Sequence, residues 1–223
     1  MNKRSGLVIA MRLILILSSI LLVYSAVQIL KAPAEAGHAL KAWEKKREEA
    51  LISPAHAELN LTNEETPLTA EMINLAVERR TSSRPQRDGD VIGEIYFPRL
   101  GTRAAILEGT QRPQLKKGAG HYEGSAVIGA AGNSVLAGHR DTVFRGLGRL
   151  KKQDLIEVET ADGRFIYEVT GSVIVDGEER GAIQDSDDAV LTLITCYPFS
   201  YVGSAPDRYL LSAALLRHEP LTK

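Results

Sequence analysis

The chain contains one cysteine, Cys196, and its place in the sequence is that of a candidate nucleophile. One cysteine cannot form an intramolecular disulfide or build a zinc cluster, so its thiol is either an apolar filler or a reactive group. Residues 191–196 (LTLITC) form a short apolar run of the strand type, and Pro198 ends it because proline cannot donate to a strand ladder. A cysteine at a strand end combines a rigid backbone with access to substrate.

The histidines are the next candidates, because a thiol with a pKa of about 8.5 needs a partner to react at neutral pH. His139 is favoured, since it follows a short apolar run and Gly138 and so also stands at a strand end. His121, which is flanked by Gly120 and Tyr122, is a weaker candidate. For the other three histidines a solvated position is favoured; they are His38, His56 and His218.

Arg208 opens the strand-type run that follows Cys196, after a loop of residues 197–207. If the two strands pair as an antiparallel hairpin, Cys196 and Arg208 meet at one rim. A guanidinium stays charged and offers several donors, which suits a substrate carbonyl or a developing oxyanion. A surface ion pair with Asp207 is an equally good interpretation of this arginine from its sequence position.

The N-terminal region predicts a membrane anchor. Residues 13–30 are 18 residues without a charge, and residues 7–30 together give about the length that a transmembrane helix needs. Lys3, Arg4 and Arg12 precede the run, so the positive-inside rule places the N-terminus in the cytoplasm and the rest of the chain outside. A cleaved signal peptide, with residues 34–36 (AEA) as its cleavage site, is the alternative, but its apolar region would be shorter.

The remaining chain divides into a stalk and one domain. Residues 1–31 are assigned to the cytoplasmic tip and anchor, 32–90 to the stalk, and 91–223 to the domain. In the stalk, residues 39–52 predict a solvated helix, 69–80 a second short helix, and 81–89 a linker. The net charge of −1 gives no sign of nucleic-acid binding, and hydrophobic residues at 44% are typical of a globular protein.

The domain predicts a mostly β fold. About eight short apolar or alternating runs are separated by glycine, proline and polar residues, without helix-length segments between them. This pattern favours an antiparallel barrel or sandwich. The predicted strands are residues 91–97, 104–107, 125–128, 134–137, 155–160, 164–170, 172–175, 191–195 and 209–216.

Three segments of this domain resemble the signatures of the sortase family, most closely those of its class D group. They are residues 136–142 (LAGHRDT) with Phe144 and Arg145, residues 192–199 (TLITCYPF), and residues 202–208 (VGSAPDR). Residues 95–100 (IYFPRL) are similar to the family's opening strand, and the resemblance extends over residues 90–216. Each segment alone is weakly specific, whereas the three in this order are highly specific.

The resemblance implies an eight-stranded antiparallel sortase-type β-barrel and a membrane-anchored transpeptidase. It implies that Cys196 is the nucleophile that forms a thioester with an LPxTG-like sorting signal, that His139 is the general acid and base, and that Arg208 holds the substrate or stabilises the oxyanion. The implied partners are membrane-tethered proteins with a C-terminal sorting motif and an amine acceptor on the cell wall or another protein.

The alternatives are a thiol endopeptidase that releases the same substrates to water, and a non-catalytic, membrane-tethered β module for protein contact. A papain-like enzyme is disfavoured because its C-G-[SA]-C-[WY] signature is missing. Calcium occurs in some sortases, but Asp185, Asp187 and Asp188 do not fit a calcium loop, so no cofactor or metal is expected.

Overall fold

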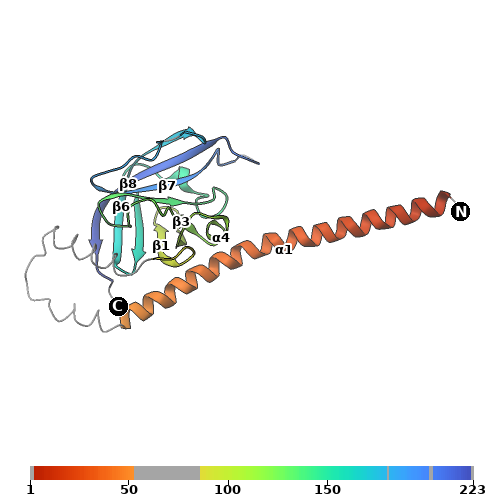
Figure 1. Cartoon of the computed structure of the whole chain (residues 1–223), viewed down its shortest axis with the longest axis horizontal. Coiled ribbons are helices and arrows are strands. Elements are labelled where there is room, and N and C mark those ends of the chain that lie inside the picture. Colours follow the sequence, from red (N-terminus) through yellow and green to blue (C-terminus); the bar gives the residue numbers. More distant parts are fainter. Residues whose placement is uncertain (1–2, 53–85, 180, 201–202, 222–223) are drawn as a thin grey trace, which may run out of the picture.

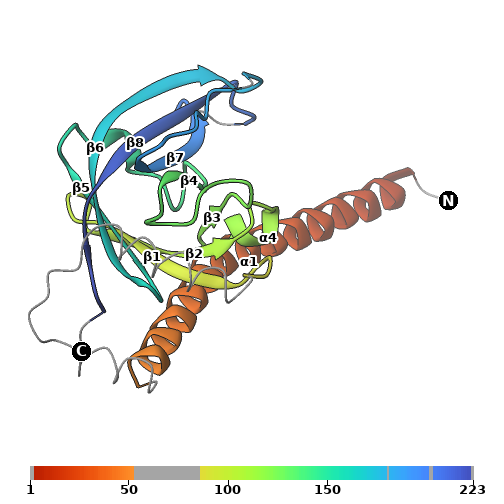
Figure 2. The same cartoon turned by 60° about the vertical axis from the view of Figure 1, so that its left-hand side comes forward.

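The computed structural model describes residues 3–52, 86–179, 181–200 and 203–221, which form a long helix and a closed β-barrel (Figure 1). Helix α1 (Lys3–Ile52) passes one side of the barrel and extends away from it toward the N-terminus (Figures 1 and 2). The helix predicted at residues 69–80, most of the linker predicted at 81–89, and His56 lie outside the described residues.

Eight strands close the barrel in the order β1-β2-β3-β4-β7-β8-β6-β5. The predicted eight-stranded, mostly β barrel is confirmed. The strands are β1 (Val91–Phe97), β2 (Thr102–Glu108), β3 (Ala119–His121), β4 (Gly132–Ala137), β5 (Leu155–Thr160), β6 (Gly163–Asp176), β7 (Ala189–Tyr197) and β8 (Asp207–Glu219). The short helices α4 (Arg112–Leu115) and η1 (Leu147–Arg149) lie in the connections.

The prediction that the barrel is antiparallel throughout is wrong at two strand pairs. β2 pairs with β3, and β4 with β7, in the parallel direction. Between β2 and β3 the chain passes through α4, and between β4 and β7 it forms the β5–β6 hairpin, so each connection is long enough for the crossover that parallel strands need. The β4–β7 pair matters for function, because parallel strands end at the same rim.

Most predicted strands are present, with three corrections. Residues 125–128 form no strand but belong to the loop before β4. The two predicted runs at 164–170 and 172–175 are one continuous strand, β6, which pairs with β8 as far as Asp176. β3 was not predicted, because its three residues are too short to show an alternating pattern.

Alternating side chains from the strands fill the barrel. In β5, for example, Ile156 and Val158 are fully buried while their neighbours are partly exposed. Burial of each such side chain contributes about 1.5–3 kcal/mol. The other large side chains in this core include Ile95, Phe97, Ile106, Leu136, Phe165, Tyr167, Leu191, Leu193 and Leu211. Because strands all around the barrel contribute side chains to this core, the core fixes the registers of the strands. The registers in turn decide which residues lie at the barrel rims.

The C-terminal half of α1 docks on the barrel instead of lying free in solvent. Ala39 and Trp43 are only 6% and 3% exposed, and Ala39 packs against Ala105 and Leu107 of β2. Lys46 Nζ donates to the carbonyl of Val91 at 2.9 Å, and Arg47 pairs with Glu159 of β5 at 2.7 Å. The prediction that residues 39–52 form a solvated helix is therefore wrong for this face, because Trp43 carries enough apolar surface to bind the barrel.

The predicted membrane span at residues 13–30 lies within α1. In the described part of the chain no helix has both the length and the apolarity required to cross a membrane, so the predicted transmembrane helix is not found in the structure.

Candidate active site

Cys196 and Arg208 lie directly opposite each other on neighbouring strands. β7 and β8 are antiparallel, and Cys196 of β7 is the register partner of Arg208 of β8. Directly opposed residues in an antiparallel pair have Cα atoms about 4.5–5.5 Å apart and side chains on the same face. Cys196 is half-buried, so its thiol is reachable from one side. A thiol and a guanidinium are therefore neighbours at this rim.

His139 reaches the same rim from β4. The last register pair of the parallel strands is Ala137 with Ile194, two residues before His139 and two before Cys196. The pairing continues for one more step, because Gly138 N donates to the carbonyl of Ile194 at 3.1 Å and Thr195 Oγ1 donates to the carbonyl of Gly138 at 2.7 Å. The side chain of His139 is exposed. Thus Cys196 and Arg208 lie in β7 and β8, and His139 lies two residues beyond β4, the strand that neighbours β7 in the barrel.

Gly138 permits this close approach. A Cβ atom at this position would lie 2.6 Å from Cδ2 of Phe144, whose ring is buried in the barrel core. The amides of Thr142 and Phe144 both point at the carbonyl of His139, at 3.4 and 3.0 Å. The segment that carries His139 therefore turns tightly around the Phe144 ring, and only glycine fits before it.

Arg208 is held by its own loop. Its Nη1 donates to the carbonyls of Ala205 at 3.2 Å and Asp207 at 2.9 Å. A Cβ at Gly177 would lie 2.9 Å from this nitrogen, so the guanidinium rests on the backbone of the β6–β7 connection. Among the described residues Arg208 forms no ion pair, and its contact with Asp207 is to the carbonyl rather than the carboxylate. The surface ion pair considered for this arginine is thus not what the structure shows.

Arg140 lies in the 136–142 segment, where its position alone indicates no role, and it connects the His139 segment to the β7–β8 loop. Its two terminal nitrogens donate to the carbonyls of Pro198, at 3.2 Å, and Gly203, at 2.8 Å. The loop therefore contacts all three strand ends of the candidate site.

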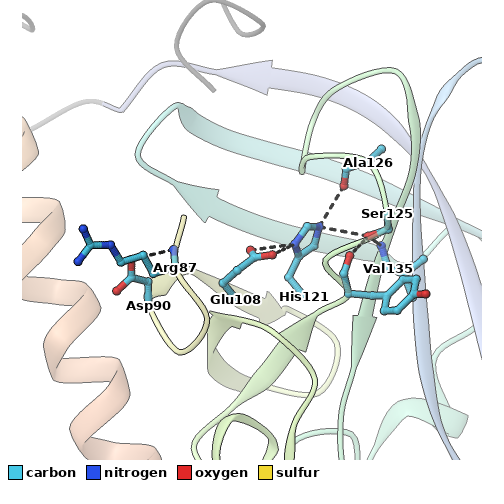
Figure 3. A network of polar contacts seen from close by, with 8 residues as sticks. Arg87, Asp90, Glu108, His121, Ser125, Ala126 and Val135 are labelled. Atoms are coloured by element: carbon cyan, nitrogen blue, oxygen red, sulfur yellow. Dashed lines mark hydrogen bonds and ion pairs between the residues drawn. The ribbon is translucent and has the colours of Figure 1, made fainter. Parts of the chain in front are cut away.

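His121, the weaker histidine candidate, is a buried member of a separate polar network (Figure 3). Its Nδ1 lies 3.0 Å from Oε2 of Glu108, and its Nε2 lies 3.0 Å from the carbonyl of Ala126 and 3.2 Å from Ser125 Oγ. Both ring nitrogens face acceptors, so the imidazolium form satisfies both. Burial lowers the pKa of His121, but the hydrogen bond and charge of Glu108 outweigh it, and the pKa is raised above its usual 6.5.

This pair predicts a pH-dependent stability. Because the pKa of His121 is raised in the folded state, its pairing stabilises the fold fully below about pH 6.5 and loses its effect as pH rises through the folded value. We therefore expect the urea midpoint of the wild type to exceed that of His121→Gln at pH 6 and the gap to narrow by pH 9. At pH 6, removal of one partner of a buried pair costs about 3–5 kcal/mol. Glu108→Gln is the matched variant and should lose the same pH dependence. A difference in urea midpoint between wild type and His121→Gln that stays constant from pH 6 to pH 9 would contradict the ion pair.

A pocket of about 310 Å³ lies far from this rim. It is an open hollow between α1 and the outer faces of β1, β2, β5 and β6, and most of its lining residues are charged: Glu44, Arg47, Glu94, Arg103, Glu157, Glu159 and Arg164, with Trp43 and Tyr96. β1 is four strands from β7 in either direction around the barrel, so this pocket lies across the barrel from Cys196. Burial is the main cause of the raised pKa of Glu94 in its wall. In the described residues no three His, Cys, Asp or Glu side chains are grouped to hold a metal ion, the Asp185–Asp188 region included.

Comparison with known proteins gives one consistent family. The sortase domain model matches residues 95–216 of this chain. Sortase D of Bacillus subtilis is 39% identical over 137 residues, which are 60% of this chain and 68% of that protein. Sortase A of Listeria monocytogenes is 31% identical over 137 residues, 60% of each chain.

Solved structures agree. The catalytic domain of B. anthracis SrtD superposes with a TM-score of 0.53 at 34% identity and covers 62% of this chain and 95% of that one. A Clostridium perfringens sortase D5 transpeptidase superposes with a TM-score of 0.60 over 82% of this chain and 99% of that one. Its 23% identity supports the fold alone.

Proposed function

Because this chain belongs to the sortase family of cysteine transpeptidases, we propose that it cleaves an LPxTG-like sorting signal and transfers the acyl group to an amine. The observation that supports this most strongly is the register of the barrel rim. Cys196 opposes Arg208 across one antiparallel pair, and His139 follows the strand parallel to the cysteine strand.

In the first half-reaction the thiolate of Cys196 attacks the Thr–Gly carbonyl carbon of the sorting signal. A C–S bond forms, and the carbonyl oxygen takes the negative charge. Arg208 donates to this oxygen, since a guanidinium offers fixed donors and does not lose its proton. His139 gives its proton to the glycine nitrogen as the C–N bond breaks, which leaves an acyl thioester on Cys196 and a free amine product.

The second half-reaction reverses these roles. His139, now neutral, removes a proton from the incoming amine as its nitrogen attacks the thioester carbon. The C–S bond breaks, the new amide is released, and Cys196 leaves as the thiolate beside the imidazolium. Atoms and charge balance without an oxidant or a cofactor.

Arg208 has donors for this oxygen besides those that make its present contacts. Both of its hydrogen bonds use Nη1, and no described residue accepts from Nη2 or Nε. The loop carbonyls thus hold the side chain of the residue opposite Cys196 and leave Nη2 and Nε without a partner among the described residues. A substrate carbonyl could be bound by these nitrogens with a small rotation of the guanidinium.

The experiment that tests the proposal is a mass-spectrometric assay with a Leu-Pro-Ala-Thr-Gly peptide, with and without triglycine as the amine. Transpeptidation predicts a thioester on Cys196 and a product that carries triglycine. Cleavage to the free acid at the same rate in both reactions would favour the thiol endopeptidase. No modification of Cys196 and no cleavage would favour a non-catalytic β module.

We also propose that the chain is anchored in the cell membrane, with the barrel outside. The support is the run of 18 uncharged residues at 13–30, the basic residues before it, and the exposure of the described apolar side chains on α1, among them Leu13, Ile14, Leu15, Ile20, Leu21 and Leu22. The substrates would be proteins tethered to the same face.

This anchoring predicts the result of a protease experiment. Added to intact spheroplasts, protease should digest the barrel, whereas a cytoplasmic marker protein stays intact. If the barrel is cut only after the membrane is broken, the proposed orientation is wrong. If carbonate washing removes the chain from the membrane fraction, the anchor is wrong.

A further inference from the structure

The described parts of the β7–β8 loop, residues 198–200 and 203–206, adjoin two strand ends of the candidate site. The loop runs from the end of β7 at Tyr197 to the start of β8 at Asp207, and so joins the strand of Cys196 to the strand of Arg208. One side of it is packed: the ring of Phe199 lies 5.7 Å from that of Tyr197 and 5.2 Å from that of Tyr209, and it covers Gly148. These contacts fix the start of the loop to the barrel but not to His139.

The contact that reaches His139 is made by the next residue in the chain, Arg140. Its Nη1 donates to the carbonyl of Pro198 and its Nη2 to the carbonyl of Gly203, so one guanidinium holds both the start and the later part of the loop. Arg140 is half-buried, and its hydrogen bond to Pro198 is partly buried, whereas its hydrogen bond to Gly203 is exposed. The backbone of His139 is in turn fixed by Gly138, which is bonded to Ile194 and Thr195 of β7.

Arginine is suited to this position for a geometric reason. A planar guanidinium presents two parallel terminal nitrogens to two separate carbonyls, whereas an ammonium group is a compact charge on a flexible stem. Lysine could reach one of the two carbonyls but could not hold them at a fixed separation. The side chain therefore sets how far the loop stands from the His139 segment.

We propose that Arg140 is a positioning residue, which holds the β7–β8 loop against the His139 segment and so sets the geometry of His139, Cys196 and Arg208. This inference rests on the proposed function for its kinetic consequence, but not for its structural one. Without the guanidinium the loop carbonyls of Pro198 and Gly203 turn to solvent, and the strand ends at the rim lose a common support.

The test compares Arg140→Gln and Arg140→Lys with wild type, and uses Arg149→Gln as the control. Arg149 is an exposed arginine in η1, on the same connection between β4 and β5. Hydrogen exchange of the full chain should show faster exchange in fragments that cover residues 198–206 of Arg140→Gln, with the β6 and β8 fragments unchanged. The exchange rate of these fragments in Arg140→Lys should lie between those of wild type and Arg140→Gln. The rate in Arg149→Gln should match that of wild type.

The kinetic measurement is cleavage of the Leu-Pro-Ala-Thr-Gly peptide beside a thermal melt. Because small misplacement of reacting groups costs up to about a hundredfold in rate, Arg140→Gln should lower kcat about tenfold to a hundredfold, with partial recovery in Arg140→Lys and an unchanged melt. Wild-type loop exchange in Arg140→Gln would overturn the proposal, and so would faster exchange with wild-type kcat. A wild-type chain that cleaves no peptide would count against the proposed function instead, and loop exchange would still decide the role of Arg140.

Discussion

Cys196→Ala should reduce peptide cleavage and acyl transfer to the uncatalysed background while the barrel remains folded. The reason for complete loss is that the chain has no second thiol to replace the nucleophile. The fold should survive, because Cys196 is half-buried at the end of β7 and is not one of the core residues, which include Leu193 and Leu211. The measurement is turnover of the sorting peptide beside a thermal melt, and we expect wild-type melting with no thioester in the mass spectrum.

Alkylation of the wild-type protein provides the matched control. Because Cys196 is the single cysteine, iodoacetamide can modify the chain at one thiol only, and full modification should abolish turnover to the level of Cys196→Ala. Turnover by Cys196→Ala above the background would show that the reaction does not pass through a thioester. Turnover by fully alkylated protein would show the same.

Much of the candidate site could be predicted because its residues lie at the ends of local sequence patterns. The apolar run before Cys196, the proline after it and the length of the loop to Arg208 together indicate a strand pair that the structure shows in register. His139 was favoured over His121 for its place at a strand end, and the structure puts the first exposed at the rim and the second in a buried ion pair.

The remaining features depend on contacts between residues that are distant in the sequence. The parallel β4–β7 pair unites segments 57 residues apart, as in the contact of Thr195 with Gly138, and no local pattern reveals its direction. Glu108 and His121 are 13 residues apart on parallel strands, so their ion pair has no signal in helix or strand periodicity. The docking of Trp43 likewise depends on a barrel face that forms only after β1, β2 and β5 have come together.

Arg208→Lys should lower kcat/KM of peptide cleavage about 10²–10³-fold, the usual cost of one lost oxyanion donor. Lysine keeps the positive charge, so a role limited to charge or to a surface pair would cost only about 0–1 kcal/mol. It cannot, however, bind the loop carbonyls of Ala205 and Asp207 and present further donors to a substrate at the same time, as the guanidinium can. The measurement is kcat/KM on the sorting peptide beside a thermal melt.

The melt separates catalysis from packing in this variant. Arg208 rests on Gly177 and contacts carbonyls of its own loop, so loss of packing would lower the melting temperature together with the rate. Arg217→Lys is the matched control, since Arg217 lies on the same strand, is exposed and pairs only with Glu219 among the described residues. We expect a large rate loss at an unchanged melting temperature for Arg208→Lys and wild-type values for Arg217→Lys. Wild-type kinetics for Arg208→Lys would remove Arg208 from the mechanism, and transition-state stabilisation would then have to come from backbone amides near Cys196 or from His139.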